Sequence, residues 1–344
     1  MSPAAVPLPI KLGFDSYSIR AFQWKAIQLL DYAAGLKLDT VQLSSLGDYE
    51  SLDPAYLQTV KEHAARVGVA IDAGIGCICP SSPAYDKKEG QPADYVARGL
   101  RVAHAVGSSV MRCYMGTRDN RRTALPLEAH IANTVKVLRA VRQQALDAGV
   151  RIAVENHAGD MQAREVKALI EEAGKDFVGS CLDTGNPMWV VEDPLLTLEI
   201  LGPYVATSHV RDSAVFEHPR GAAAQWVPLG LGSVDFTRFV QLYRKLCPGA
   251  SVQLEIITGR PPEVLPYLES DFWKAFPDMP AWEFARFLVL AKSGRPFLGN
   301  MVIGQRSGNS PVLEAALKEQ QRLDLERSLD FAREKLGLGI RGRA

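Results

Sequence analysis

The chain has 344 residues, and Lys plus Arg equals Asp plus Glu at 39 each. A net charge of zero gives no support for a protein that binds nucleic acid or a membrane surface, and we expect neither partner. Hydrophobic residues make up 47% and charged residues 23%, which is usual for a globular enzyme. The length fits two average domains or one α/β barrel of about 250 residues with additions.

The cysteines indicate a reducing compartment. The five cysteines are Cys77, Cys79, Cys113, Cys181 and Cys247, which is an odd number, and four of the five lie in apolar, strand-like surroundings. We therefore expect reduced core residues and a cytoplasmic protein. Cys77 and Cys79 have no second pair nearby, so a zinc site is not expected there. The N-terminal segment MSPAAVPLPIK lacks the basic start and apolar core of a signal peptide, and no run of 18 apolar residues predicts a transmembrane helix.

Strand-like and helical patterns alternate along the first three quarters of the chain. The predicted strands are 11–18, 39–44, 69–75, 109–116, 150–155, 177–183, 205–211 and 251–257. The predicted helices are 21–34, 54–67, 92–106, 126–148, 161–173, 194–201 and 235–246. This alternation favours parallel strands joined by crossover helices, and eight such units close into a (β/α)₈ TIM barrel. An open doubly wound sheet is the alternative, but no G-x-G-x-x-G or G-x-x-x-x-G-K loop supports it.

We expect residues 1–260 to form the catalytic barrel and residues 261–344 to form a C-terminal helical extension. The extension begins with a segment rich in proline and aromatic residues, 261–278, followed by an apolar helix over 280–291. A last helix begins at Pro311, with Ser310 as its N-cap. The aromatic segment either packs against the barrel or forms a lid or a subunit contact over its mouth.

The stretch VRIAVENHAG, residues 150–159, ends a predicted buried strand with a carboxylate. Ile152 and Val154 alternate with Ala153 and Glu155, which is typical of a strand with one apolar face. An unpaired carboxylate in a low dielectric is costly. Glu155 therefore needs a metal ion, an arginine or a proton as its partner.

Three more predicted strands end in residues of the metal-ligand type, which are Asp183, His209 and Glu255. Because strand residues two apart share a face, Glu155 and these residues can all point into the barrel while their apolar neighbours face the helices. Three carboxylates and one imidazole at one point would repel each other without a cation. An oxygen-rich site with a single histidine suits Mn²⁺, Mg²⁺ or Co²⁺ better than a structural zinc.

The same stretches carry a family resemblance. VENHAGD around Glu155, CLDTGNP around Asp183, SHVRD around His209 and QLEI around Glu255 resemble the xylose-isomerase-like barrel superfamily of sugar isomerases and epimerases. The similarity covers residues 10–260. It implies one catalytic divalent metal, most often Mn²⁺, held by these four residues, with a small-molecule sugar or glycoside as substrate.

This ligand set predicts proton transfer next to a carbonyl group. A metal on the carbonyl oxygen makes the neighbouring C–H acidic, and two carboxylates can remove and return the proton. We expect Glu155 and Glu255 to serve as this acid/base pair. His157, on the same face as Glu155, either orients a hydroxyl and relays a proton or only supports a ligand by a hydrogen bond.

Further residues are candidates for substrate binding. Arg211, two residues after His209, either holds a substrate oxygen or phosphate or forms an ion pair with Asp212 or Glu217. Arg112 and Tyr114, at the end of the fourth predicted strand, are weaker candidates for the same cavity.

The chain also departs from the ketose 3-epimerase pattern. Asn186 stands where a histidine is expected, and Leu231 replaces the carboxylate of a Gly-Glu-Gly turn. The inserted stretch 216–226 adds His218, Arg220 and Trp226, which could line a pocket for a larger, aromatic glycoside.

Two enzymatic functions follow as expectations. The first is a metal-dependent sugar or keto-sugar isomerase/epimerase, and the alternative is a lyase that cleaves 3-oxo-(C-)glycosides by elimination. We expect a homo-oligomer, or a hetero-oligomer with a small subunit. A DNA-repair endonuclease of this fold would need more histidines than the six present. A non-catalytic sugar-binding barrel would not require the pair of glutamates.

Overall fold

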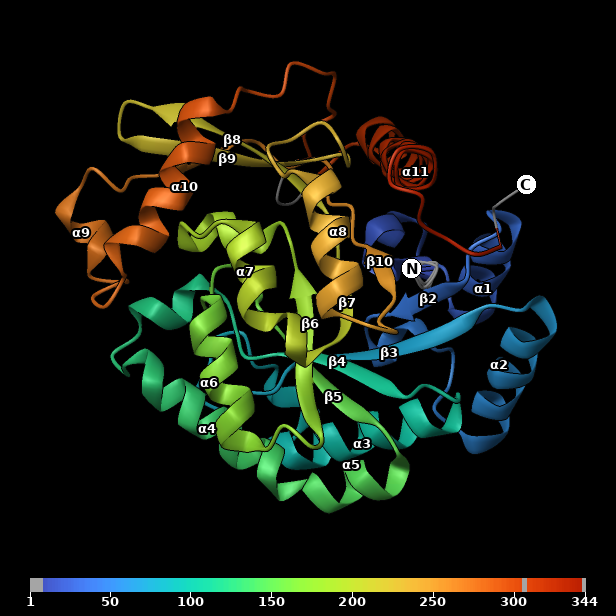
Figure 1. The fold of residues 1–344 in the computed structure, drawn as a ribbon. Helices are drawn as coiled ribbons and strands as arrows, with labels where there is room; N and C mark the ends of the chain where they lie inside the picture. The colour runs from blue at the N-terminus through green and yellow to red at the C-terminus, as the bar shows by residue number, and fades with distance from the viewer. Residues whose placement is uncertain (1–8, 305–307, 342–344) are drawn as a thin grey trace, which may run out of the picture.

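A computed structural model describes residues 9–304 and 308–341, and the start of the segment searched for a signal peptide, residues 1–8, lies outside them. Eight parallel strands form one sheet in the order β10-β1-β2-β3-β4-β5-β6-β7 (Figure 1). They are β1 (Leu12–Asp15), β2 (Thr40–Leu43), β3 (Ala70–Cys77), β4 (Val110–Tyr114), β5 (Arg151–Glu155), β6 (Val178–Asp183), β7 (Val205–His209) and β10 (Val252–Leu254).

The sheet closes into a cylinder between β7 and β10. The amide of Val210 donates to the carbonyl of Gln253 at 2.7 Å, and the amide of Glu255 donates to the carbonyl of Val210 at 3.1 Å. These bonds extend the parallel pairing just beyond the ends of the two strands. The TIM-barrel prediction is therefore confirmed.

Helices surround the strands (Figure 1). Those within the predicted barrel are α1 (Ala26–Gly35), α2 (Pro54–Val67), α3 (Pro92–Ala105), α4 (Leu127–Ala140), α5 (Arg142–Ala148), α6 (Ala163–Ala173), α7 (Pro194–Leu201) and α8 (Phe236–Leu246). The helix predicted over 126–148 is divided in two because Val141 leaves the helical conformation, with φ −107° and ψ 7°. The helix predicted over 21–34 begins later, because a 3₁₀ helix, η1 (Ser16–Phe22), precedes it.

Side chains on the strands alternate between two environments. Ile152 and Val154 belong to the main core between strands and helices, whereas Ala153 packs with Val110 and Cys181 in a separate cluster. Glu155 shares the inward parity of Ala153, two residues before it. All five cysteines are buried and free, as predicted. None of the described helices is both long and apolar enough to cross a bilayer.

A small antiparallel sheet beside the barrel mouth was not predicted. The inserted stretch forms a hairpin of β8 (Asp212–His218) and β9 (Gly221–Val227), to which β11 (Glu263–Leu265) adds. This sheet, α9 (Ser270–Trp273) and α10 (Ala281–Ser293) enclose a second apolar core. Phe272 and Phe276 of the aromatic segment are buried in that core. These two side chains are therefore packed in the interior, in the second core beside the barrel and not in the main core between strands and helices.

The last helix, α11 (Pro311–Glu334), packs against the barrel. Leu325, Leu329 and Ala332 are buried in the main core together with strand residues. Ser310 caps the helix, since its hydroxyl accepts from the amide of Leu313 at 3.2 Å. Nearer the mouth, the hydroxyl of Thr258 donates to Asp324 at 2.7 Å.

Thr258→Val should destabilise the protein by about 1–3 kcal/mol, because the buried carboxylate of Asp324 loses a donor while the side-chain shape is kept. Urea unfolding followed by circular dichroism measures the change. Thr59→Val is the matched control, because Thr59 is exposed on α2. Equal losses for both variants would contradict the idea that this bond helps to hold α11 on the barrel.

Candidate metal centre and active site

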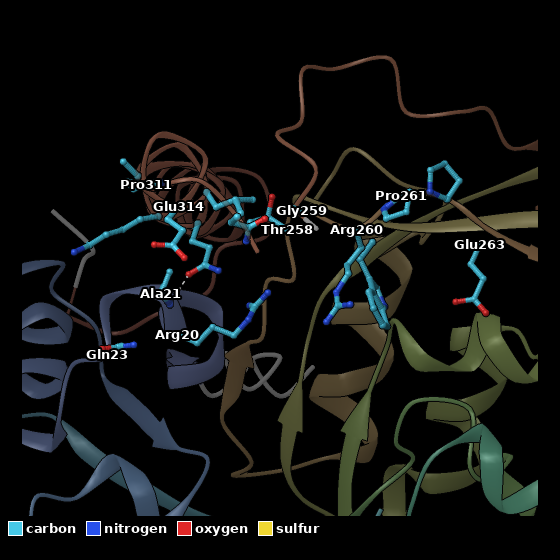
Figure 2. Close-up of a pocket in the computed structure, with 18 of the residues that line it drawn as sticks. Arg20, Ala21, Gln23, Thr258, Gly259, Arg260, Pro261, Glu263, Pro311 and Glu314 are labelled. Atoms are coloured by element: carbon cyan, nitrogen blue, oxygen red, sulfur yellow. Dashed lines mark hydrogen bonds between the residues drawn. The ribbon is translucent and has the colours of Figure 1, made fainter. Parts of the chain in front are cut away.

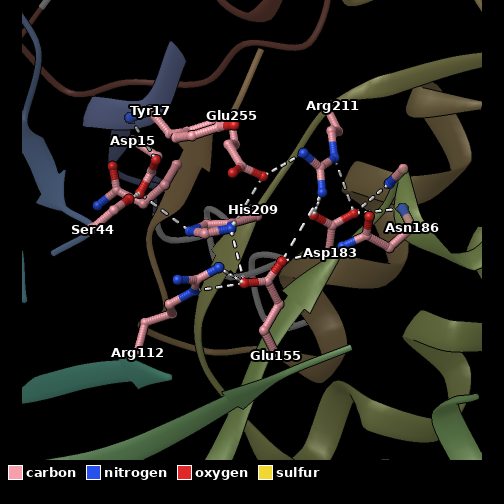
Figure 3. A network of polar contacts seen from close by, with 12 residues as sticks. Asp15, Tyr17, Ser44, Arg112, Glu155, Asp183, Asn186, His209, Arg211 and Glu255 are labelled. Carbon is pink, nitrogen blue, oxygen red and sulfur yellow. Dashed lines mark hydrogen bonds and ion pairs between the residues drawn. The ribbon is translucent and has the colours of Figure 1, made fainter. Parts of the chain in front are cut away.

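Four predicted ligands from neighbouring strands meet at the carboxyl end of the barrel (Figure 3). Glu155, Asp183, His209 and Glu255 each offer one ligand atom, and these atoms all lie within 4.8 Å of one another. All four residues are buried. The parallel strands cause this meeting, because their carboxyl ends lie at the same edge of the cylinder.

The imidazole of His209 is held with one nitrogen toward the carboxylates. Its Nδ1 lies 3.3 Å from an oxygen of Glu155 and 3.3 Å from an oxygen of Glu255. Its Nε2 lies 3.0 Å from the amide oxygen of Gln42 and 3.3 Å from a carboxylate oxygen of Asp15. Two acceptors at Nε2 favour the tautomer protonated there. Burial disfavours the charged ring, but Cys181, Glu155 and Glu255 raise the pKa of His209 well above its usual range, so without a metal Nδ1 also carries a proton. A bound cation would take the place of that proton on Nδ1.

Glu155 is held by groups on both sides. Arg112 donates from Nε to Oε2 at 2.6 Å, and Asn186 donates from Nδ2 to Oε1 at 3.1 Å. Burial disfavours the charged carboxylate, but Arg112 and His209 outweigh it and keep the pKa of Glu155 well below its usual range. Arg112 and Asn186, which were predicted to bind substrate, therefore contact Glu155, one of the four predicted metal ligands.

Arg211 bridges two of the other ligands. Its guanidinium pairs with Asp183 and lies 2.5 Å from an oxygen of Glu255. Burial opposes the charge of Glu255, yet Arg211 and His209 lower its pKa to about 2. Burial, together with Glu155 and Glu255, raises the pKa of Asp183 to about 7 in spite of Arg211.

The ion pairs considered for Arg211 with Asp212 or Glu217 do not form. Asp212 instead accepts four backbone N–H groups, from Ser213 and from the loop 230–234. This loop is the one that resembles a Gly-Glu-Gly turn. Its Leu231 is 41% exposed.

His157 stacks on Tyr114, with ring centroids 3.8 Å apart. The Nδ1 of His157 donates to the carbonyl of Gly116 at 2.7 Å, so Nε2 remains for another partner. Burial lowers the pKa of His157, and the ring is therefore neutral near pH 7. A neutral ring with Nε2 free of hydrogen bonds to the described residues can accept one from a substrate hydroxyl.

The inserted stretch contributes one of its three candidates to the mouth. The Trp226 ring lies 5.0 Å from the guanidinium carbon of Arg211 and stacks on Trp189 at 4.3 Å. His218 lies near the hairpin turn, where its Nδ1 accepts from the amide of Arg220 at 3.2 Å. Arg220 pairs with Glu269 at the surface. The structure places no residue of the site next to His218, among the residues it describes. A substrate contact by His218 therefore stays a prediction.

Sequence reasoning missed Asp15 and Gln42, which hold Nε2 of His209. Both lie at or near the carboxyl ends of their strands, β1 and β2, as the predicted ligands do. Their position was therefore a usable signal. Their chemistry was not, because an aspartate or glutamine at a strand end has many structural uses.

The cluster fits a divalent cation by its donors and by its charges. It offers three carboxylates and one imidazole nitrogen, and the buried Nδ1 of His209 has no hydrogen-bond partner among the described residues. A cation would also relieve the repulsion that helps to raise the pKa of Asp183. Oxygen-rich donor sets with one histidine suit Mn²⁺, Mg²⁺ or Co²⁺.

Comparison with known families agrees with this geometry. The model of a family described as xylose isomerase-like TIM barrel matches residues 30–275, which include all four ligands. The chain belongs to this family. The resemblance inferred from the four sequence stretches is thus confirmed.

Individual members of the xylose isomerase-like family are more distant. The 3-oxo-isoapionate decarboxylase of Pectobacterium atrosepticum is 24% identical over 250 residues, which cover 68% of this chain and 80% of that enzyme. A crystal structure of D-psicose 3-epimerase in the presence of D-fructose superposes with a TM-score of 0.60 at 17% identity, over 95% of this chain and 100% of that one. A family member from Mycobacterium smegmatis in complex with magnesium gives 0.56 at 14% identity, over 93% and 98% of the two chains.

Proposed function

We propose that this protein is a divalent-metal-dependent enzyme that moves a proton at the carbon next to the carbonyl group of a keto-sugar, as an isomerase or epimerase. The observation that carries the proposal is the placement of two glutamates around one point. Oxygens of Glu155 and Glu255 each lie 3.3 Å from Nδ1 of His209, and in Figure 3 the two side chains approach it from opposite sides. A carbon held between two such carboxylates can lose a proton to one and regain it from the other.

The metal would complete this arrangement. Held by Glu155, Asp183, His209 and Glu255, an ion such as Mn²⁺, Mg²⁺ or Co²⁺ would stabilise negative charge on the substrate oxygens and so make the adjacent C–H acidic.

The remaining side chains prepare the two glutamates for their task. Arg112 keeps Glu155 ionised and fixes its orientation, and Arg211 does the same for Glu255. An ionised carboxylate can accept a proton, and the same group returns it as a carboxylic acid. His157 offers Nε2 to a substrate hydroxyl, and Trp226, which stacks on Trp189 and lies against Arg211, lines the space that the substrate would enter.

A second function shares the same first intermediate but breaks a different bond. In decarboxylation, the bond from the carbon next to the carbonyl to a carboxylate would break, carbon dioxide would leave, the electron pair would form the enolate, and a glutamic acid would supply a proton to that carbon. In elimination, a glutamate would remove the proton next to the carbonyl, the bond from the following carbon to the leaving group would break, and the leaving group would take that electron pair and a proton. Two observations favour this alternative. A family relative is a 3-oxo-acid decarboxylase by name, and Leu231 stands where the epimerase pattern has a carboxylate. Cleavage of 3-oxo-glycosides, with or without a partner subunit, belongs to the same class.

Deuterium exchange tests the proposal and separates the two outcomes. The protein is loaded with Mn²⁺ and incubated in D₂O with a panel of ketoses, 3-keto sugars, 3-keto glycosides and keto-sugar acids, and products are analysed by NMR and mass spectrometry. We expect deuterium at the carbon next to the carbonyl for at least one sugar, with an epimer or isomer as product. Release of carbon dioxide or an aglycone would favour cleavage. Absence of both with every sugar would refute the proposal.

A further inference from the structure

A large cavity lies above the ligand cluster. Its volume is about 1170 Å³, which is slightly above the usual range for small-molecule sites. Trp226 lines this cavity and lies against Arg211, which in turn contacts Glu255. The cavity and the cluster are thus separated by only one layer of side chains. A substrate that reaches the cluster would extend into the cavity.

Positive charge predominates in the cavity wall. The charged residues that line it are Arg20, Arg118, Arg260, Lys318, Glu263 and Glu314. Arg118 pairs with Glu263. Neither Arg20 nor Arg260 has a carboxylate of the described residues within ion-pair distance, although every arginine at the cluster below has one.

Arg20 and Arg260 face each other. Figure 2 shows Arg20, from η1, and Arg260, from the segment after β10, with their guanidinium groups directed toward the same space. Arg20 is held in place by Tyr17: its Nη1 donates to the carbonyl at 2.9 Å, and its guanidinium carbon lies 4.3 Å from the ring centroid. Burial lowers the pKa of Arg20, and the positive charge of Arg260 lowers it further, although Tyr17 and Glu255 act in the opposite direction. Glu255, whose negative charge acts on Arg20 from a distance, is already paired with Arg211, so the two facing cations have no ion-pair partner of their own among the described residues.

We propose that Arg20 and Arg260 together bind an anionic group of the substrate, a carboxylate or a phosphate, so that the substrate is an acidic keto-sugar and not a neutral ketose. This inference rests on the proposed function, because it assigns a charge to the substrate of the same site. Guanidinium groups bind carboxylate and phosphate through paired hydrogen bonds, and two of them supply more charge than one monoanion needs. The substrate named for the P. atrosepticum relative is itself a carboxylate.

Binding of matched ligands tests the charge of the substrate without any turnover. D-Fructose, D-fructuronate and D-fructose 6-phosphate share a ketone and differ at one end, which is neutral, carboxylate or phosphate. Inorganic phosphate and acetate serve as probes that carry the anionic group alone, without a sugar. Each is added to the Mn²⁺-loaded protein at equal ionic strength, and Tm and Kd are measured by thermal unfolding and calorimetry.

At least one anionic ligand should raise Tm more than D-fructose does. Whether the carboxylate or the phosphate ligand binds more tightly identifies the anionic group of the substrate. Arg20→Gln and Arg260→Gln should each weaken the binding of that anion by about 10- to 100-fold in Kd, because each substitution removes a hydrogen bond between charged groups. Arg220→Gln is the control, because Arg220 is exposed and pairs with Glu269 away from the cavity. Arg260 is exposed, so its variant should fold even if the Arg20 variant does not.

The outcomes separate the two proposals. If no anion binds better than D-fructose, or if both arginine variants bind the anion as the unmodified protein does, the anion site is wrong. Deuterium exchange with a neutral ketose and no preference for charge would overturn this inference and leave the proposed function standing. Selective anion binding without exchange on any sugar would do the reverse.

Discussion

Glu255→Gln is expected to block proton exchange from one of two epimeric substrates by about 10²- to 10⁴-fold while sparing the other. The reason is geometric. If Glu155 and Glu255 lie on opposite sides of the reacting carbon, each removes the proton of one epimer only. Glu155→Gln should therefore show the opposite selectivity, and both variants should lose epimerisation. The measurement is deuterium wash-in at saturating Mn²⁺, followed by NMR for each epimer separately.

Three controls keep this result interpretable. Bound metal is measured in each variant, since both glutamates are also proposed ligands. Glu255→Asp retains a carboxylate and should keep more exchange than Glu255→Gln. Glu269→Gln alters an exposed glutamate and should change nothing. Equal loss of exchange for both epimers in both variants, with metal retained, would contradict the two-base arrangement.

Much of the site could be predicted because parallel strands place their carboxyl ends together. Once the β/α alternation indicated a barrel, the parity of Glu155, Asp183, His209 and Glu255 required them to point inward at one end. The distances within the cluster agree with that reasoning. Purely structural roles, such as isolated ion pairs, rarely explain four residues of the metal-ligand type in register on adjacent strands.

The partners of the ligands could not be predicted in the same way. Arg211 was expected to contact the substrate or a nearby acidic residue, yet it bridges Asp183 and Glu255. Asp212, the nearer carboxylate in sequence, is occupied by four amides of a loop. Such choices depend on loop conformations, which local sequence patterns do not specify.

The mouth of the barrel was the least predictable part of the fold. β9 reads GAAAQWV, and its small residues give no alternating pattern of polar and apolar side chains. Phe272 and Phe287, far along the chain, share one apolar core with Ala222 and Ala224 of β9, so distant residues help to bury this strand. Arg20 and Arg260 lie 240 positions apart, and only the closed barrel brings both to one cavity.

Metal binding should depend on Gln42 even though Gln42 is not a proposed ligand. Its amide oxygen lies 3.0 Å from Nε2 of His209 and so helps to hold Nδ1 toward the carboxylates. Gln42→Leu removes this acceptor and should weaken Mn²⁺ binding by about 10- to 100-fold, the usual effect of losing a residue that orients a metal-ligating histidine. His209→Gln removes a ligand and should weaken binding more. Titration of Mn²⁺, followed by calorimetry and by the electron paramagnetic resonance of the free ion, gives both affinities.

Gln143→Leu, at an exposed position on α5, makes the same chemical change away from the site and should leave the affinity unchanged. Circular dichroism checks that the Gln42 variant keeps its fold, because Gln42 is fully buried. A Gln42→Leu protein that is folded and binds Mn²⁺ as tightly as the unmodified chain would show that the histidine needs no help from β2. A His209→Gln protein with unchanged affinity would remove the imidazole from the ligand set, and with it the argument for a metal at this point of the barrel.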